Sequence, residues 1–191
     1  NYREGVIAQF FYIGAQVTCW TFIMHYGHEV FCAQGGMTES AASALSFRYY
    51  IGALILFAIG RFVCTYFLKY VSPGVLLATL AFFATALLMG VIFAGGITGM
   101  WCLVGISGCM SLMFPTIYGL ALHGLGDNVK FGGAGLIMSI LGGSVLPPIQ
   151  AAIMDRGADI LGLPAVNASF IVPVVCFIVV AWYGVSCKRQ S

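Results

Sequence analysis

The sequence predicts an all-α integral membrane protein, built as a bundle of six membrane-spanning helices. Its 191 residues are 61% hydrophobic and only 7% charged, whereas a soluble domain carries about 25% charge. Six apolar segments are each long enough to cross a bilayer, and the charged and turn-forming residues lie in the short breaks between them. No break is long enough for a soluble domain, so residues 1–191 are expected to form one six-helix domain.

The six predicted spans cover about residues 5–26, 41–68, 74–94, 97–122, 131–154 and 168–185. Turn-forming residues separate them: Ser72-Pro73-Gly74 precedes the third span, and Gly95-Gly96 precedes the fourth. Because the number of spans is even, both ends of the chain lie on one side of the membrane. Six of the eight basic residues fall on that side: Arg3, Arg61, Lys69, Lys130, Lys188 and Arg189. The positive-inside rule therefore predicts that both ends are cytoplasmic.

The first span carries a stripe of polar and amphipathic side chains. Gln9, Tyr12, Gln16 and Trp20 follow one another at intervals of 3, 4 and 4 residues, which places them on one face of an α-helix. From Gln9 to Gln16 this face is about 11 Å long. Unpaired polar groups are costly in hydrocarbon, so the stripe must meet something other than lipid. It either bonds to neighbouring helices or lines a cavity for a small polar solute.

Two later spans carry proline. In the fifth span Gly135, Ser139 and Gly143 form a small-residue stripe that favours close helix contact, and Pro147-Pro148 follows. Proline removes a backbone donor and clashes one turn back, so these helices should be distorted.

Pro115 has the same effect in the fourth span, between Phe114 and Tyr118. Two kinked spans are compatible with a moving gate and equally with static bends.

The ionisable residues exclude several functions. All six carboxylates lie at span ends or in loops, so a buried acid for a proton relay is not in this segment. Arg48 lies one and a half to two turns inside the second span. Its side chain either snorkels to the outer interface or faces a cavity and binds an oxygen-rich solute. The net charge of +2 comes from few charges and predicts no nucleic-acid partner.

No catalytic or metal-binding pattern is convincing. The segment Gly105-Ile106-Ser107-Gly108 has the form of a serine-protease motif, but His123 lies about 24 Å further along the same helix. His25 and His28 lack partners at ligand spacing apart from Glu29 and Cys32. The seven cysteines include no C-x-x-C pair and should behave as small hydrophobic residues. We expect no enzyme activity, metal or cofactor.

Four motifs carry a family resemblance. The run AQFFYIGAQVTCW at residues 8–20 resembles the seventh helix of the L-fucose:proton symporter group of the major facilitator superfamily. The motif GRF at residues 60–62 resembles the eighth helix of that group, and MSLMFPTIY at residues 110–118 resembles the tenth. GLGDNVKFG at residues 124–132, followed by ILGG at 140–143, is similar to the cytoplasmic loop and eleventh helix.

The resemblance implies the C-terminal half of a twelve-helix transporter that imports L-fucose or a related monosaccharide with protons, in a bacterial inner membrane. The first residue, Asn1 rather than Met, agrees with a segment of a longer protein. In this family the proton-carrying carboxylates lie in the N-terminal half, and two six-helix bundles rock around a midplane site.

The expected sugar-binding wall has two tiers. Its first members are Gln9, Tyr12, Gln16 and Trp20, and its second are Phe114, Tyr118 and Ser139. Phe114 stands where the family is expected to have a tyrosine, so one hydroxyl contact is missing and the exact sugar need not carry over. The alternative is a structural or assembly bundle in which the polar stripe only joins helices. A transporter half should present Gln9, Tyr12 and Gln16 on an open concave surface, whereas a structural bundle should pair them fully.

Overall fold

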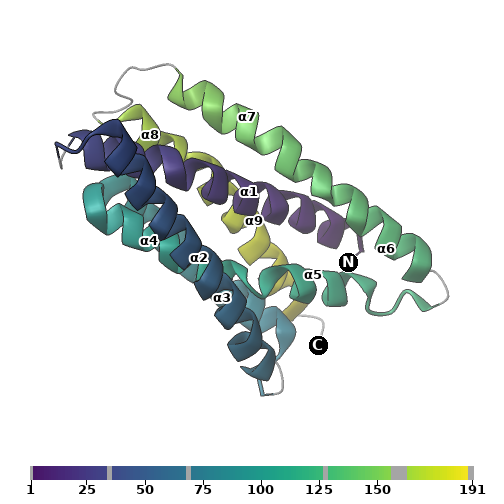
Figure 1. The fold of residues 1–191 in the computed structure, drawn as a ribbon. Coiled ribbons are helices and arrows are strands. Elements are labelled where there is room, and N and C mark those ends of the chain that lie inside the picture. Colours follow the sequence, from purple (N-terminus) through teal and green to yellow (C-terminus); the bar gives the residue numbers. More distant parts are fainter. Residues whose placement is uncertain (1, 34–35, 68–69, 127–128, 156–162, 189–191) are drawn as a thin grey trace.

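The computed structural model describes residues 2–33, 36–67, 70–126, 129–155 and 163–188, and these form a bundle of long helices (Figure 1). Six helical stretches are long and apolar enough to cross a membrane by their length and composition. The predicted all-α class with six spanning helices is therefore confirmed.

Several of the predicted spans consist of more than one helical element. The elements are α1 (Tyr2–Ala33), α2 (Glu39–Phe67), α3 (Pro73–Ala94), α4 (Gly96–Met110), α5 (Met113–Leu122), α6 (Val129–Met138), the 3₁₀ turn η2 (Ser139–Leu141), α7 (Gly142–Met154), α8 (Ala165–Ser169) and α9 (Ile171–Lys188). The fourth span is α4 with α5, the fifth is α6, η2 and α7, and the sixth is α8 with α9.

Helix α1 is the central element of the bundle. It packs against α9, α7, α2 and α5, and Figure 1 shows α6–α7 and α2 running along opposite sides of it. In the most apolar window of each span, 56% of the α1 residues are buried, compared with 17% for α2 and 28% for α6–α7. Helices α2 and α6–α7 therefore keep most of their surface available to lipid or to another part of a larger protein.

Glycine allows α1 and α7 to touch at the backbone. A Cβ atom on Gly142 would lie 2.0 Å from the carbonyl oxygen of Phe10, and one on Gly14 would lie 1.9 Å from a methyl group of Leu146. The small-residue stripe of the fifth span also faces α1, since a Cβ on Gly135 would meet the Tyr2 hydroxyl. Gly143 belongs to the same packed contact, where a Cβ approaches Val17.

The fourth span breaks one turn before its proline. Helix α4 ends at Met110 and α5 begins at Met113. Pro115 has no N–H, and its ring crowds the carbonyl one turn back, at Ser111. The Ser111 N–H bonds to Gly108 O at 3.3 Å, and its hydroxyl donates to the same oxygen at 2.8 Å. The local chain thus satisfies itself with shorter-range hydrogen bonds.

The fifth span behaves differently at its proline pair. Pro147 and Pro148 lie inside the α-helical stretch α7. The irregular turn is η2, about two turns before the prolines, and it is followed directly by Gly142, which contacts α1.

Candidate functional site

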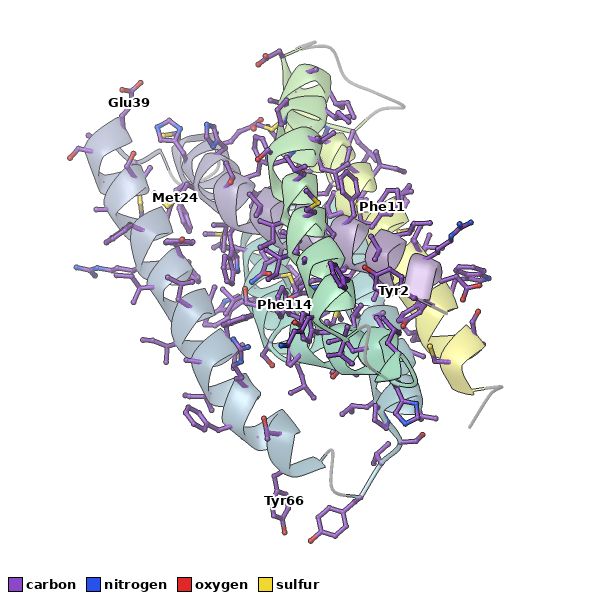
Figure 2. All side chains as sticks on the ribbon, turned by 90° about the vertical axis from the view of Figure 1, so that its right-hand side faces the viewer. Tyr2, Phe11, Met24, Glu39, Tyr66 and Phe114 are labelled. Atoms are coloured by element: carbon purple, nitrogen blue, oxygen red, sulfur yellow. The ribbon has the colours of Figure 1, made fainter. Side chains whose placement is uncertain are left out.

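The four residues of the α1 stripe have different environments. Gln9 and Tyr12 are fully buried, whereas Gln16 and Trp20 are half-buried. The open surface expected for Gln9, Tyr12 and Gln16 in a transporter half is therefore not seen at Gln9 and Tyr12, because neighbouring helices cover them. Figure 2 shows Phe114 about midway between Glu39 and Tyr66, which mark the two ends of α2. Because Tyr12 contacts Phe114 with ring centroids 6.4 Å apart, the stripe lies near the middle level of the bundle.

Tyr12 is bonded to the break in the fourth span. Its hydroxyl donates to the carbonyl oxygen of Met110 at 2.8 Å. Met110 is the last residue of α4, and the final carbonyls of a helix have no partner within that helix. The Tyr12 hydroxyl therefore satisfies an acceptor at the break that Pro115 produces.

Trp20 joins three helices. Its indole Nε1 donates to Ser107 Oγ in α4 at 3.2 Å, and its ring meets Phe57 of α2 edge to face at 5.0 Å. Ser107 is buried, and its own hydroxyl donates to Leu103 O at 3.5 Å. The serine of the protease-like motif is thus a packing partner of Trp20, while His123 lies exposed at the end of α5.

Phe114 and Tyr118 form an aromatic platform. Their rings stack at 6.3 Å with an interplanar angle of 11°, and both side chains are half-buried. A Cβ on Gly133 would lie 2.8 Å from the Tyr118 hydroxyl, which brings this platform against α6. Tyr12, Phe114 and Tyr118 are therefore one column of rings between α1, α5 and α6.

Ser139 lies apart from this column. It is buried in η2, and its hydroxyl donates back to the carbonyl of Leu136. It lines an apolar groove with Phe10, Phe11 and Gly135, on a face of α1 that does not carry the stripe. Its predicted contact with sugar would require the hydroxyl to leave its own helix.

Gln9 is a buried polar side chain of the stripe without a hydrogen-bond partner among the described residues. It is completely buried, and neither its amide nitrogen nor its amide oxygen has a hydrogen-bond partner among the described residues. An unpaired buried polar group costs about 1–3 kcal/mol. Gln9 therefore has unused donors and an unused acceptor for a polar partner, whereas the polar atoms of Tyr12 and Trp20 are already bonded.

The structure adds two residues that the sequence did not place in the site. Ser107 of α4 and Phe57 of α2 hold Trp20 of α1. These residues lie on three different helices, so no spacing within one helix signals their contact.

The carboxylates of the described residues lie away from the middle of the bundle. The carboxylates in the described ranges, Glu4, Glu29, Glu39 and Asp155, all lie at or near helix ends. Asp127 and Asp159 lie outside the described residues. Where the structure describes the chain, no group of three or more His, Cys, Asp or Glu side chains is arranged to hold a metal ion.

Known proteins resemble the whole chain. It is 45% identical over 184 residues to the L-fucose-proton symporter of Haemophilus influenzae, covering 96% of the chain and 41% of that relative. It is 34% identical over 180 residues to a glucose/galactose transporter of Brucella abortus, covering 94% of the chain and 40% of that relative. The crystal structure of the E. coli fucose:proton symporter matches with a TM-score of 0.86 and 32% identity, over 97% of the chain and 42% of that structure. No family model matches the chain.

The chain spans about two fifths of the length of the curated relatives it matches. Those relatives and the matching structure are transporters rather than enzymes. The chain is homologous to L-fucose-proton symporters, and its six long helices have the fold of part of a major facilitator superfamily transporter.

Proposed function

We propose that this chain is the C-terminal six-helix half of a secondary transporter that imports L-fucose or a related monosaccharide together with protons. One observation carries the proposal: in a chain 45% identical to a fucose symporter, the polar stripe of α1 meets the broken α4–α5 pair near the middle of the bundle. Alternating access around such a midplane site is the mechanism of this class of fold.

The chemistry of the site suits a sugar. The half-buried amide of Gln16 can donate to and accept from ring hydroxyls, and the stacked rings of Phe114 and Tyr118 offer a flat apolar face to the C–H side of the sugar. These neutral groups give modest affinity, which suits a solute that must also leave. Phe114 lacks a hydroxyl, so the bound monosaccharide loses one contact that a tyrosine would make.

The proton site belongs to the other half of the transporter in this proposal. A proton carrier inside a membrane is normally a buried carboxylate or histidine, and every carboxylate of this sequence lies at a span end or in a loop. The distribution of basic residues supports cytoplasmic ends for this segment in a bacterial inner membrane.

The gate in this proposal uses the two irregular helices. The site would open and close as the halves rock, because the two helices bend. One bend is at Ser111–Leu112, before Pro115. The other is at η2, which lies next to Gly143 and before Pro147 and Pro148.

A second function is favoured by two contacts. Tyr12 and Trp20 are both hydrogen-bonded to α4, which is what a structural bundle with a stripe that joins helices requires. In the transporter proposal these two residues hold the frame, and Gln16 is the residue of the stripe that meets the sugar.

Uptake of radiolabelled L-fucose, glucose and galactose by the complete protein in proteoliposomes tests the proposal, with and without an imposed pH gradient. We expect gradient-driven uptake of at least one sugar. Gln16→Ala should weaken uptake while membrane insertion stays intact, with Ile55→Ala on the exposed face of α2 as the matched control. Absence of sugar uptake under both conditions, from correctly inserted protein, would leave the structural bundle as the better description.

A further inference from the structure

A groove between α2 and α4 lies outside the candidate sugar site. It has a volume of about 270 Å³ and is lined by Leu45, Arg48, Tyr49, Gly52, Trp101 and Val104. A Cβ on Gly52 would meet no atom within 4 Å, so the glycine leaves the groove open along α2. None of these residues contributes to the column of rings or to the amides of the stripe.

The wall of the groove is rigid. The Tyr49 ring stacks on Phe31 of α1 at 5.8 Å and 28°, and Trp101 of α4 meets it edge to face at 5.4 Å. Phe31 is buried, so it fixes the position of Tyr49 from the inside of the bundle. Three helices thus hold the aromatic wall in place, and a ligand finds it already formed.

The groove carries one charge and no opposite charge. Arg48 is exposed, and the lining contains no carboxylate. Apart from Arg48, the lining is apolar or aromatic. A ligand that fits must therefore combine one anionic group with a long apolar segment. A monosaccharide fits poorly because each of its hydroxyls needs a polar partner, whereas the lining offers few.

The depth of Arg48 matches the boundary of the hydrocarbon. Helix α2 has 29 residues, and a helix of that length is about 43 Å long, close to the full thickness of a bilayer with its headgroups. Arg48 follows Glu39, the first residue of α2, by about 14 Å along the axis. Its Cα then lies in the hydrocarbon, and its long stem can carry the guanidinium toward the phosphate level.

From these observations we infer that the groove binds one anionic glycerophospholipid, with its phosphodiester on the Arg48 guanidinium and one acyl chain along Gly52 between α2 and α4. Guanidinium and phosphate form paired, charge-assisted hydrogen bonds. This lipid site needs neither the sugar nor the proton, so it can be tested independently of the proposed transport function.

Native mass spectrometry of the complete purified protein tests the inference. The probes are phosphatidylglycerol and phosphatidylcholine, each offered at matched concentration. We expect wild-type protein to retain phosphatidylglycerol, and Arg48→Gln to reduce this retention on the order of tenfold, as expected for a lost hydrogen bond to a charged group. Arg48→Lys should restore part of it. Lys130→Gln, which removes an exposed charge from α6, is the control.

A second variant tests the proposed binding position of the acyl chain. Gly52→Leu fills the groove with a side chain that meets no neighbour at its Cβ, so the fold should be kept while phosphatidylglycerol is no longer retained. Gly119→Leu is its matched control, because Gly119 is also a helical glycine with no atom within 4 Å of a built Cβ. Retention unchanged in both Arg48→Gln and Gly52→Leu would overturn the inference. So would displacement of the lipid by inorganic phosphate, which indicates a free-anion site, or by L-fucose, which indicates a solute site.

Discussion

Replacing Tyr12 by phenylalanine tests how the break in the fourth span is stabilised. The substitution keeps the ring and its contact with Phe114 but removes the hydroxyl that donates to Met110 O at 2.8 Å. Both partners lie in the buried interior. The variant therefore loses a hydrogen bond and leaves a helix-terminal carbonyl without that donor.

The expected loss of stability follows from these two effects. Hydrogen bonds between membrane helices contribute about 0.6 kcal/mol on average and up to about 1.7 kcal/mol, and a buried acceptor left unpaired costs about 1–3 kcal/mol. We expect Tyr12→Phe to lower the free energy of unfolding of the complete protein by about 1–2 kcal/mol. The measurement is reversible unfolding by denaturing detergent in bicelles.

Tyr183→Phe is the matched control. Tyr183 is as fully buried as Tyr12, but its hydroxyl has no hydrogen-bond partner among the described residues. Removing that hydroxyl should leave stability unchanged or raise it slightly. If the two variants are destabilised equally, the loss reflects burial of a phenol in general, and the assigned role of the Met110 contact is wrong.

Three further predictions concern other contacts of α1 and the aromatic platform. Gly142→Ala should prevent correct folding, because its Cβ would lie 2.0 Å from Phe10 O. Gly119→Ala is the control and should fold normally, because there is open space around Gly119. Expression level and monodispersity on gel filtration distinguish the two outcomes. A double-mutant cycle with Trp20→Phe and Ser107→Ala should give a coupling energy of about 0.5–1.5 kcal/mol from detergent unfolding, and additive effects would contradict the bond between them. Phe114→Tyr should lower the KM for a transported sugar without lowering the maximal rate, and an unchanged KM for every sugar tested would remove Phe114 from the binding wall.

The sequence predicts the helices well because membrane spans depend on length and apolar composition alone. The sequence predicts less well where each helix ends and which residues meet across the bundle. The first span was expected to end near residue 26, but α1 continues to Ala33, because a helix can extend beyond the hydrocarbon with His28 and Glu29 still on it. Pro115 predicted a distortion, and the structure has the break one turn earlier.

Partners across the bundle were beyond the reach of the sequence. The spacing of the stripe fixes a shared helix face, yet Tyr12 and Trp20 bond to residues 98 and 87 positions away. Whether a buried amide is paired, as Gln9 is not, depends on that tertiary packing. Ser139 was expected in the sugar-binding wall by its position, but a serine can also return its hydroxyl to its own helix, as it does here.

The break between α4 and α5 and the 3₁₀ turn η2 both contact the same turn of α1. The Phe10 carbonyl contacts Gly142 directly after η2, and the Tyr12 hydroxyl, two residues later, binds the last carbonyl of α4 before the Ser111–Leu112 break. Because these contacts are backbone-close and buried, a change of bend in either helix must displace this turn or break one of the two contacts. The stripe and the ring column share that turn through Tyr12 and Phe114. The geometry of the candidate sugar site is therefore coupled to the two helix breaks by direct contact, and Tyr12→Phe interrupts the connection to the α4–α5 break.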